Sequence, residues 1–264
     1  MRIVTANLNG IRSAGRKGFF SWMTRQRADV VCVQETKAQR DQLDDALYHP
    51  RSFHNAFVDA QKKGYSGVAL YARREPDEII TSLRDASHDR HAGWDEFDAE
   101  GRYVEARFGK LSVVSLYLPS GSSGDVRQDA KWRFLDLFGP HLERLAKGER
   151  QYVICGDWNI AHKRIDIKNW RSNQKNSGFL PEERAFMDTL IDDYGYVDAF
   201  REVDQREEQY TWWSNRGQAY ANNVGWRIDY QILSPSLAGS VSKARVYREK
   251  RFSDHAPLII DYAF

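Results

Sequence analysis

Short apolar runs rich in β-branched residues recur along the chain, and they constrain its fold more than any other feature. They cover residues 2–6, 29–34, 67–72, 103–108, 111–118, 152–155, 226–233 and 257–262. Several of these runs are continuously apolar, which is typical of strands that are covered on both faces. We therefore expect sheets that are buried between other layers of the protein.

Helical spacing appears between some of these runs. Helices are expected over residues 17–26, 126–146 and 182–192. The last of these begins with Pro181 followed by two acids, which is typical of a helix start. Residues 103–108 and 111–118 are expected to form a hairpin around Gly109-Lys110. Strands and helices therefore do not alternate strictly, which indicates a mixed α and β fold rather than an eight-fold barrel.

A single domain is expected over residues 1–264. The chain has no Pro-rich or Ser-rich linker, no sequence repeat and no low-complexity segment. Its 41% hydrophobic and 29% charged residues are typical of a soluble globular protein and exclude disordered, collagen-like and disulfide-scaffold classes. Two long irregular stretches, residues 159–180 and 205–225, carry aromatic and basic residues, which favours a functional role over disorder.

Net charge and cysteine content limit the classes of binding partner and the cellular compartments that the chain fits. The 39 Lys and Arg residues against 37 Asp and Glu leave a net charge of only +2, so any nucleic-acid binding must come from local patches. Cys32 and Cys155 lie in apolar stretches and are expected to be free, buried thiols, which favours a reducing compartment and argues against a zinc site. No window approaches 18 uninterrupted apolar residues, and the first residues resemble a strand rather than a signal sequence. We expect a cytoplasmic monomer that is complete from Met1 and makes no membrane contact.

Acidic and amide side chains follow the apolar runs where strands give way to loops. These are Asn7 and Asn9 in ANLNG, Glu35 in QETK, Asp157 and Asn159 in GDWN, Asp229 in WRIDY, and Asp254 and His255 in SDHAP. Strand ends that meet at one edge of a sheet bring such groups together although they are far apart in sequence. The sequence therefore predicts an acidic site at one edge.

The residue types in this set point to phosphodiester hydrolysis. Carboxylate and amide oxygens suit Mg²⁺ or Mn²⁺, and the set has no convergent Cys or His group for a softer metal. The sole imidazole, His255, is suited to donate to a phosphate oxygen or to transfer a proton. A hard cation, an acidic base and one imidazole are the equipment for activating water against a phosphate.

Each of these residues also has a simpler structural interpretation. Glu35 alone resembles a solvated loop residue, and Gly156-Asp157 alone resembles a turn. His255 alone would fit a structural histidine, and Asp229 could cap a loop or pair with Arg227. The order of the motifs along the chain and the residues that surround each position are more specific than any one residue.

Six motifs together carry a resemblance to a known family. Asn7 with Asn9, QETK, LYLPSG, GDWN, GWRIDY and SDHAP occur in that order between residues 7 and 257. In this order they resemble the exonuclease III family of apurinic/apyrimidinic (AP) endonucleases, within the endonuclease/exonuclease/phosphatase superfamily. The resemblance implies an α+β (α/β) fold, a four-layered α/β sandwich of two packed mixed β-sheets flanked by helices. It also implies cleavage of double-stranded DNA on the 5′ side of an abasic site, leaving a 3′-hydroxyl, with 3′ to 5′ exonuclease and 3′-phosphatase or phosphodiesterase activity on blocked 3′ ends.

The resemblance also implies roles for the motif residues. Glu35 would be the principal Mg²⁺ ligand, completed or oriented by Asn7 and Asn9. Asp157, held by Asn159, would align or deprotonate the attacking water, and both would belong to the metal site.

The remaining motif residues would act on the phosphate. His255 would bind and neutralise it, oriented by Asp229, and Tyr117 would contact it. Asp254 would assist the metal or the leaving group, and both Asp254 and His255 are counted among the candidate metal-site residues.

Two departures from the family pattern affect details. Relatives commonly carry an acid or Asn where Asn9 stands, so Asn9 is expected to act through its amide, which leaves Glu35 as the anionic ligand on that side. Many relatives have an amide side chain where this chain has Ser120. These changes bear on metal number and fine positioning and leave the reaction unchanged.

Local patches are predicted to contact DNA. Residues 163–175 carry five bases against one acid, and five of the eight tryptophans lie between residues 158 and 226. By resemblance, Trp212, Trp226 and Ile228 would wall a slot for the flipped abasic sugar. The expected backbone contacts are Arg216, Tyr220, Lys62, Lys63 and Tyr65. The alternative is that the tryptophans fill the core and the basic run is a solvated loop.

Two other functions are compatible with parts of the same sequence motifs. Superfamily members that act on inositol phosphates or sphingomyelin share the acidic site, but GWRIDY and the loop aromatics favour the AP-endonuclease branch. A nonenzymatic, regulatory RNA-associated protein of the catabolite repression control type shares KNWR, PEER and GWR. In that relative the metal and nucleophile positions are altered, whereas Glu35, Asp157, Asn159, Asp254 and His255 are present here.

Overall fold

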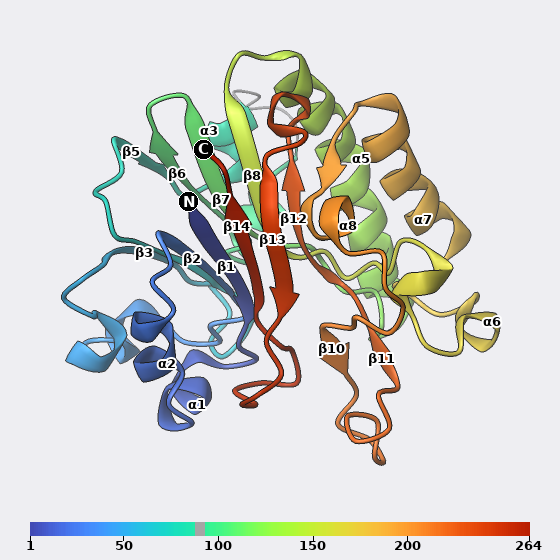
Figure 1. The fold of residues 1–264 in the computed structure, drawn as a ribbon, viewed down its shortest axis with the longest axis horizontal. Coiled ribbons are helices and arrows are strands. Elements are labelled where there is room, and N and C mark those ends of the chain that lie inside the picture. The colour runs from blue at the N-terminus through green and yellow to red at the C-terminus, as the bar shows by residue number, and fades with distance from the viewer. Residues whose placement is uncertain (88–92) are drawn as a thin grey trace.

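The computed structural model describes residues 1–87 and 93–264, and within them two six-stranded sheets pack face to face (Figure 1). The first sheet has the order β13-β14-β1-β2-β4-β3 and the second β5-β6-β7-β8-β12-β9. Each sheet is mixed, because β1 runs parallel to β2 and β7 parallel to β8 while the other neighbours are antiparallel. A separate pair, β10-β11, lies below the two sheets in Figure 1.

The strands are β1 (Arg2–Asn7), β2 (Val30–Gln34), β3 (His54–Val58), β4 (Val68–Ala72), β5 (Glu78–Ile80), β6 (Tyr103–Phe108), β7 (Leu111–Tyr117), β8 (Gln151–Asp157), β9 (Val197–Asp198), β10 (Trp212–Trp213), β11 (Gly225–Trp226), β12 (Asp229–Leu233), β13 (Val241–Val246) and β14 (Leu258–Tyr262). The helices are α1 (Ile11–Arg16), α2 (Phe19–Arg25), α3 (Leu83–Ser87), α4 (Asp95–Asp98), α5 (Asp125–Lys147), α6 (Trp170–Asn173), α7 (Pro181–Asp188) and α8 (Ala199–Val203).

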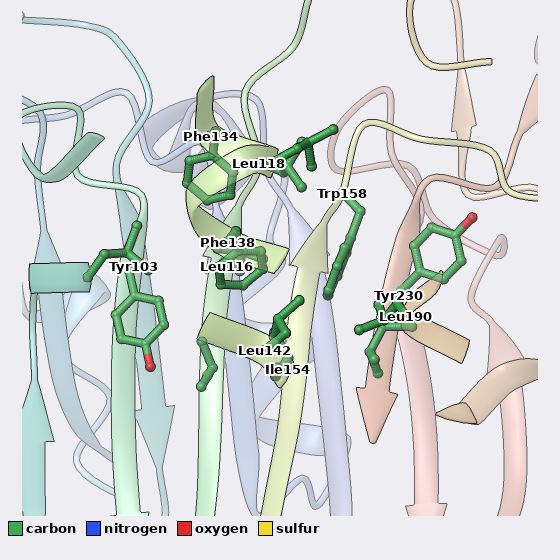
Figure 2. Close-up of a cluster of buried hydrophobic side chains, with 14 of the residues drawn as sticks. Tyr103, Leu116, Leu118, Phe134, Phe138, Leu142, Ile154, Trp158, Leu190 and Tyr230 are labelled. Carbon is green, nitrogen blue, oxygen red and sulfur yellow. The ribbon is translucent and has the colours of Figure 1, made fainter. Parts of the chain in front are cut away.

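Apolar layers on both faces of each sheet explain the continuous apolar runs. Ile3 of β1 and Val153 of β8 lie in the buried cluster between the sheets, whereas Val4 faces the cluster beneath α1 and α2. On the far side, Phe134 of α5 packs over the outer face of the second sheet, near Leu116 (Figure 2). Helix, sheet, sheet and helix therefore form four layers, and the predicted sandwich is confirmed.

All eight expected strand runs contain strands, but three expected elements differ in detail. The helix expected over residues 17–26 is wrong at its start, because Gly18 has φ +87° and separates α1 from α2, which begins at Phe19. The run 226–233 is two strands, since Trp226 pairs in β11 while β12 begins at Asp229. The helix expected to end at residue 192 is α-helical only to Asp188 and continues as a π-helical turn.

The prediction of two free, buried thiols is confirmed. Cys32 and Cys155 are both free and buried. None of the helices in the described ranges is long and apolar enough to cross a bilayer.

A buried ion-pair network anchors the connection from β11 to β12. The Arg227 side chain is fully buried, and its guanidinium lies 2.8 Å from Asp166 and 2.6 Å from Asp198. Arg201 makes a second ion pair with Asp166 at 2.7 Å. Burial opposes ionisation of Asp166, but the charges of Arg227 and Arg201 outweigh it and lower the pKa of Asp166 to about 2.

Arg227→Met is expected to lower the free energy of unfolding by about 3–5 kcal/mol, because it leaves buried Asp198 without its cation and removes one of the two cations that pair with Asp166. Urea titration followed by circular dichroism measures this change. The matched control is Arg206→Met, since Arg206 is exposed in its pair with Asp204 and its loss is expected to leave the free energy of unfolding almost unchanged. Equal effects of the two substitutions would contradict the network's role.

Candidate active site

Asn7, Glu35 and Asp157 meet where β1, β2 and β8 end. The Asn7 amide nitrogen donates to Glu35 Oε1 at 2.8 Å and to Asp157 Oδ2 at 2.9 Å. One amide therefore joins a carboxylate from the first sheet to one from the second.

We call the meeting point of Asn7, Glu35 and Asp157 the corner. Two similar turns shape it, one after β1 of the first sheet and one after β8 of the second. Asn7 Oδ1 accepts from the Asn9 backbone at 3.0 Å, and Asp157 Oδ1 accepts from the Asn159 backbone at 2.9 Å. Asn9, Asn159 and Glu35 all have positive φ angles, of 44°, 52° and 51°. These left-handed conformations are uncommon for residues other than glycine, and the hydrogen bonds that the Asn9 and Asn159 backbones donate to the strand-end side chains help to hold those two residues.

His255 is held by Asp229 beside this corner. His255 Nδ1 lies 2.9 Å from Asp229 Oδ2, and its Nε2 lies 3.9 Å from Asp157 Oδ2. Burial disfavours the protonated ring, but the charge and hydrogen bond of Asp229 and the charge of Asp157 outweigh it and raise the pKa of His255 to about 10. The ring is therefore an imidazolium at neutral pH. Asp229 does not pair with Arg227, which was one open alternative, because Arg227 binds Asp166 and Asp198 instead.

Burial dominates the titration of Asp157. It raises the pKa of Asp157 well above its usual range, with Asp229 and Glu35 adding to the effect and the His255 charge opposing it. Several carboxylates crowd one buried imidazolium, which is an arrangement that a further cation would stabilise.

Asp254 joins the corner to the tryptophans. It accepts from the Asn9 amide at 2.9 Å and from the Trp212 indole nitrogen at 3.2 Å. Burial opposes its ionisation, but the His255 charge and hydrogen bonds from Asn9 and Ser253 lower the pKa of Asp254.

The donor set fits a hard cation. Ligand atoms of Glu35, Asp157 and His255 lie within 4.8 Å of one another. The two carboxylates, with the amide oxygens beside them, are suited to Mg²⁺ or Mn²⁺. His255, as an imidazolium, is better suited to bind an anion than a metal.

The corner opens into a cleft of about 1230 Å³. Of the predicted residues, the cleft is lined by Asn9, Glu35, Lys62, Tyr65, Tyr117, Asp157, Asn159, Trp212, Arg216, Trp226, Ile228, Asp254 and His255. Asn7 and Asp229 lie behind this lining and orient its members. The rings of Trp212 and Trp226 pack edge to face, with their centroids 6.0 Å apart. Both rings lie in one apolar cluster with Ile228.

Tyr220 lies elsewhere. It is not among the described lining residues, because its hydroxyl donates to the Arg248 carbonyl and its ring packs on Trp213. Lys63 is also not among them.

Sequence reasoning missed several residues of the cleft. Lys37 pairs with Glu35 at 2.6 Å and also donates to the Asn9 side chain. Its place in QETK, two residues after Glu35, was an available signal. Arg127 and Glu100 also line the cleft and pair with each other, and buried Arg102, outside the described lining, pairs with Glu100 as well. Both arginines donate to the Tyr65 hydroxyl, which joins segments that are distant in sequence.

Comparison with known proteins agrees with this geometry. The chain is 35% identical over 260 residues to an exodeoxyribonuclease of Bacillus subtilis, covering 98% of both chains. It is 34% identical to the DNA repair nuclease APEX1 of Danio rerio, covering 98% of this chain and 81% of that protein.

The solved structures support the same relationship. An AP endonuclease from Archaeoglobus fulgidus superposes with a TM-score of 0.87 at 26% identity, with both chains fully covered. The Endonuclease/Exonuclease/phosphatase family matches residues 4–255 of this chain. The chain therefore belongs to the endonuclease/exonuclease/phosphatase family.

Proposed function

We propose that this chain is a metal-dependent DNA repair nuclease that hydrolyses the phosphodiester bond on the 5′ side of an abasic site. The products would be a 3′-hydroxyl and a 5′ sugar phosphate, and the same site would remove nucleotides, phosphates and other blocks from 3′ ends. The convergence of Glu35, Asp157 and His255 at the floor of a tryptophan-walled cleft carries this proposal. The relatives named as exodeoxyribonuclease and DNA repair nuclease support it.

Asp157 is proposed to accept the proton of the attacking water. Its Oδ2 faces both Asn7 and the imidazolium of His255, and its Oδ1 is fixed by the Asn159 backbone. A bound cation would favour the ionised carboxylate, so Asp157, whose pKa burial raises, would act as a base beside such an ion.

His255 and Tyr117 are proposed to bind the scissile phosphate. His255 presents Nε2 while Asp229 fixes its Nδ1, so the ring keeps both its charge and its orientation. Burial, with help from Glu35 and Asp157, raises the pKa of Tyr117 well above its usual value. The Tyr117 hydroxyl therefore stays protonated and donates to the phosphate, which leaves Asp157 as the base.

Glu35 is proposed to be the principal ligand of Mg²⁺, with Mn²⁺ as a substitute. Asn7 orients Glu35, and Asn9 offers an amide oxygen beside Lys37. The bound ion would supply positive charge to the scissile phosphate. Asp254, held by Asn9 and Trp212, would assist the metal or the leaving oxygen.

Substrate choice is proposed to come from the apolar slot. Trp212, Trp226 and Ile228 form a wall that suits a sugar without a base. Lys62, Tyr65 and Arg216 line the outer cleft, where they would contact the DNA backbone. Tyr220 would act from its position beside Arg248, outside the cleft.

A panel of three labelled duplexes tests the proposed function. One carries a single abasic analogue, one a recessed 3′-hydroxyl end, and one a nick with a 3′-phosphate. With Mg²⁺ we expect all three to be processed, and the abasic duplex to be cut once, at the lesion. Absence of any processing would reject the nuclease proposal.

Incision is expected to require Mg²⁺ or Mn²⁺ and to stop in excess EDTA, because the oxygen donors hold a hard cation that offsets phosphate charge. Initial rates across a series of divalent ions measure this requirement. Restoration of activity by added Mg²⁺ after chelation is the control for irreversible damage. Undiminished cutting in EDTA would contradict the metal assignment.

Three further expectations stay predictions. These are a single domain over residues 1–264, a monomer in solution, and a location in the cytoplasm. The apolar layer shared by both sheets supports the first, because separating the sheets would expose it.

A further inference from the structure

A fully buried ion pair lies directly behind the cleft and does not take part in the chemistry described above. Lys131 of α5 and Glu183 of α7 are 2.6 Å apart, and both side chains have zero exposure. Neither is among the described residues that line the cleft. Burying two charges costs several kcal/mol per ion, and apolar residues of similar volume are often equally stable, so stability alone does not account for the pair.

The pair holds two loops that do line the cleft. Lys131 Nζ donates to the Asn159 carbonyl at 2.8 Å. Glu183 Oε2 accepts from the Gly178 and Leu180 backbones at 2.6 Å and 3.0 Å. The loops also contact each other, since the Ala161 backbone donates to the Gly178 carbonyl at 2.8 Å.

Through Asn159, Lys131 is connected to Asp157, the proposed base. The Asn159 backbone donates to Asp157 Oδ1 at 2.9 Å, and its side chain donates to the Leu118 carbonyl at 2.9 Å. Asn159 has φ +52°, a conformation that needs support from its surroundings. The ammonium on its carbonyl gives that support, so the chain of contacts runs from Lys131 through Asn159 to Asp157.

The Glu183 end leads to the slot. Gly178 has φ +92°, and a side chain there would bring a Cβ to 2.9 Å from Trp226 Cζ3. The Gly178 backbone therefore lies directly against the indole that walls the slot, and Glu183 fixes that backbone through its N–H group.

We infer that Lys131 is a positioning residue for catalysis, which with Glu183 fixes the turn carrying Asp157 and Asn159 against the wall of the slot. This inference rests on the proposed function. It assigns a role to the PEER segment, in which Glu183 lies, and to a lysine that sequence analysis did not single out.

The test uses the double variant Lys131→Met/Glu183→Gln. It removes both charges together, and the Gln oxygen can still accept from Gly178 and Leu180, so the strong contact that is lost is the one on the Asn159 carbonyl. The two longer contacts of Glu183 Oε1, from Gln128 at 3.3 Å and Ser177 at 3.4 Å, change as well. We expect kcat for incision of an abasic duplex to fall about tenfold while KM changes less than about twofold, because ground-state DNA contacts stay in place. We also expect faster hydrogen exchange at the Asn159 amide.

Two comparisons separate positioning from general stability. Glu183→Gln alone keeps the hydrogen bond from Lys131 to the Asn159 carbonyl but leaves the buried ammonium without its carboxylate. At a temperature where circular dichroism shows this variant to be folded, kcat is expected to stay within about threefold of wild type. Glu105→Gln/Arg107→Met removes another buried carboxylate and its arginine, 2.8 Å apart on β6, and is expected to leave kcat unchanged. If the first double variant does not fold, Lys131→Gln/Glu183→Gln replaces it, since the shorter glutamine also leaves the Asn159 carbonyl.

The outcomes for the inference and for the proposed function can be told apart. A folded variant with wild-type kcat, or an equal loss of kcat in the Glu105/Arg107 control, would overturn the inference. Failure of the wild-type protein to incise would reject the proposed function instead, and exchange at the Asn159 amide would still report whether Lys131 holds it.

Discussion

Asp157→Asn is expected to lower the single-turnover rate constant for incision by about 10³-fold, because the amide keeps the shape of the side chain but accepts no proton from water. Asp157 is the carboxylate that faces Asn7, His255 and the Asn159 backbone at once. Quenched-flow incision of a saturated abasic duplex measures the change, and binding of the same duplex in Ca²⁺ shows whether affinity is retained.

The matched control is Asp188→Asn. Asp188 also contacts a histidine, His162, at 2.7 Å, but it lies outside the cleft lining and is partly exposed. We expect its incision rate to stay near wild type. A rate for Asp157→Asn within about threefold of wild type would show that another group serves as the base.

Asp229→Asn is expected to lower incision by about 10²–10³-fold at neutral pH and to change the pH profile. Asp229 keeps the buried His255 ring charged, since its charge is the largest influence that raises the pKa of His255 to about 10. Without it, burial favours the neutral ring. The protonated ring is the active form, so activity is lost as pH rises through its pKa, and that loss moves to lower pH in the variant.

Incision rates between about pH 6 and pH 9 measure this shift. The wild-type rate is expected to show no loss from His255 across that range, whereas the variant recovers part of its activity toward the acidic end. His162→Gln, which alters a histidine away from the cleft, serves as the control. A variant profile with the same shape as the wild-type profile would contradict the role of Asp229.

The strands that sequence predicted are those with two buried faces. Residues 30–34 and 68–72 are buried throughout, and such runs are apolar without interruption. β3 and β13 were missed because they lie at the edges of the first sheet and are only partly buried. β9, β10 and β11 have two residues each, too few for any periodicity.

The convergence of the acidic and amide side chains was predictable because they lie at or just after the ends of predicted strands. Asn7, Glu35 and Asp157 each end or directly follow a strand, and the pairing of β1 with β2 brings the first two together. Supporting contacts were not predictable from local pattern. Lys131 and Glu183 are 52 residues apart on two helices, and nothing near either residue indicates the partner.

Mapping the cut in one duplex that contains a single abasic analogue tests the central claim most directly. The lesion strand is labelled at its 5′ end, incubated with wild-type protein and Mg²⁺ or with EDTA, and its product is offered to a DNA polymerase. The account predicts a Mg²⁺-dependent product that ends at the nucleotide before the lesion and is extended, since it carries a 3′-hydroxyl. A cut on the 3′ side, a product that resists extension, or no cut with any divalent ion would contradict it.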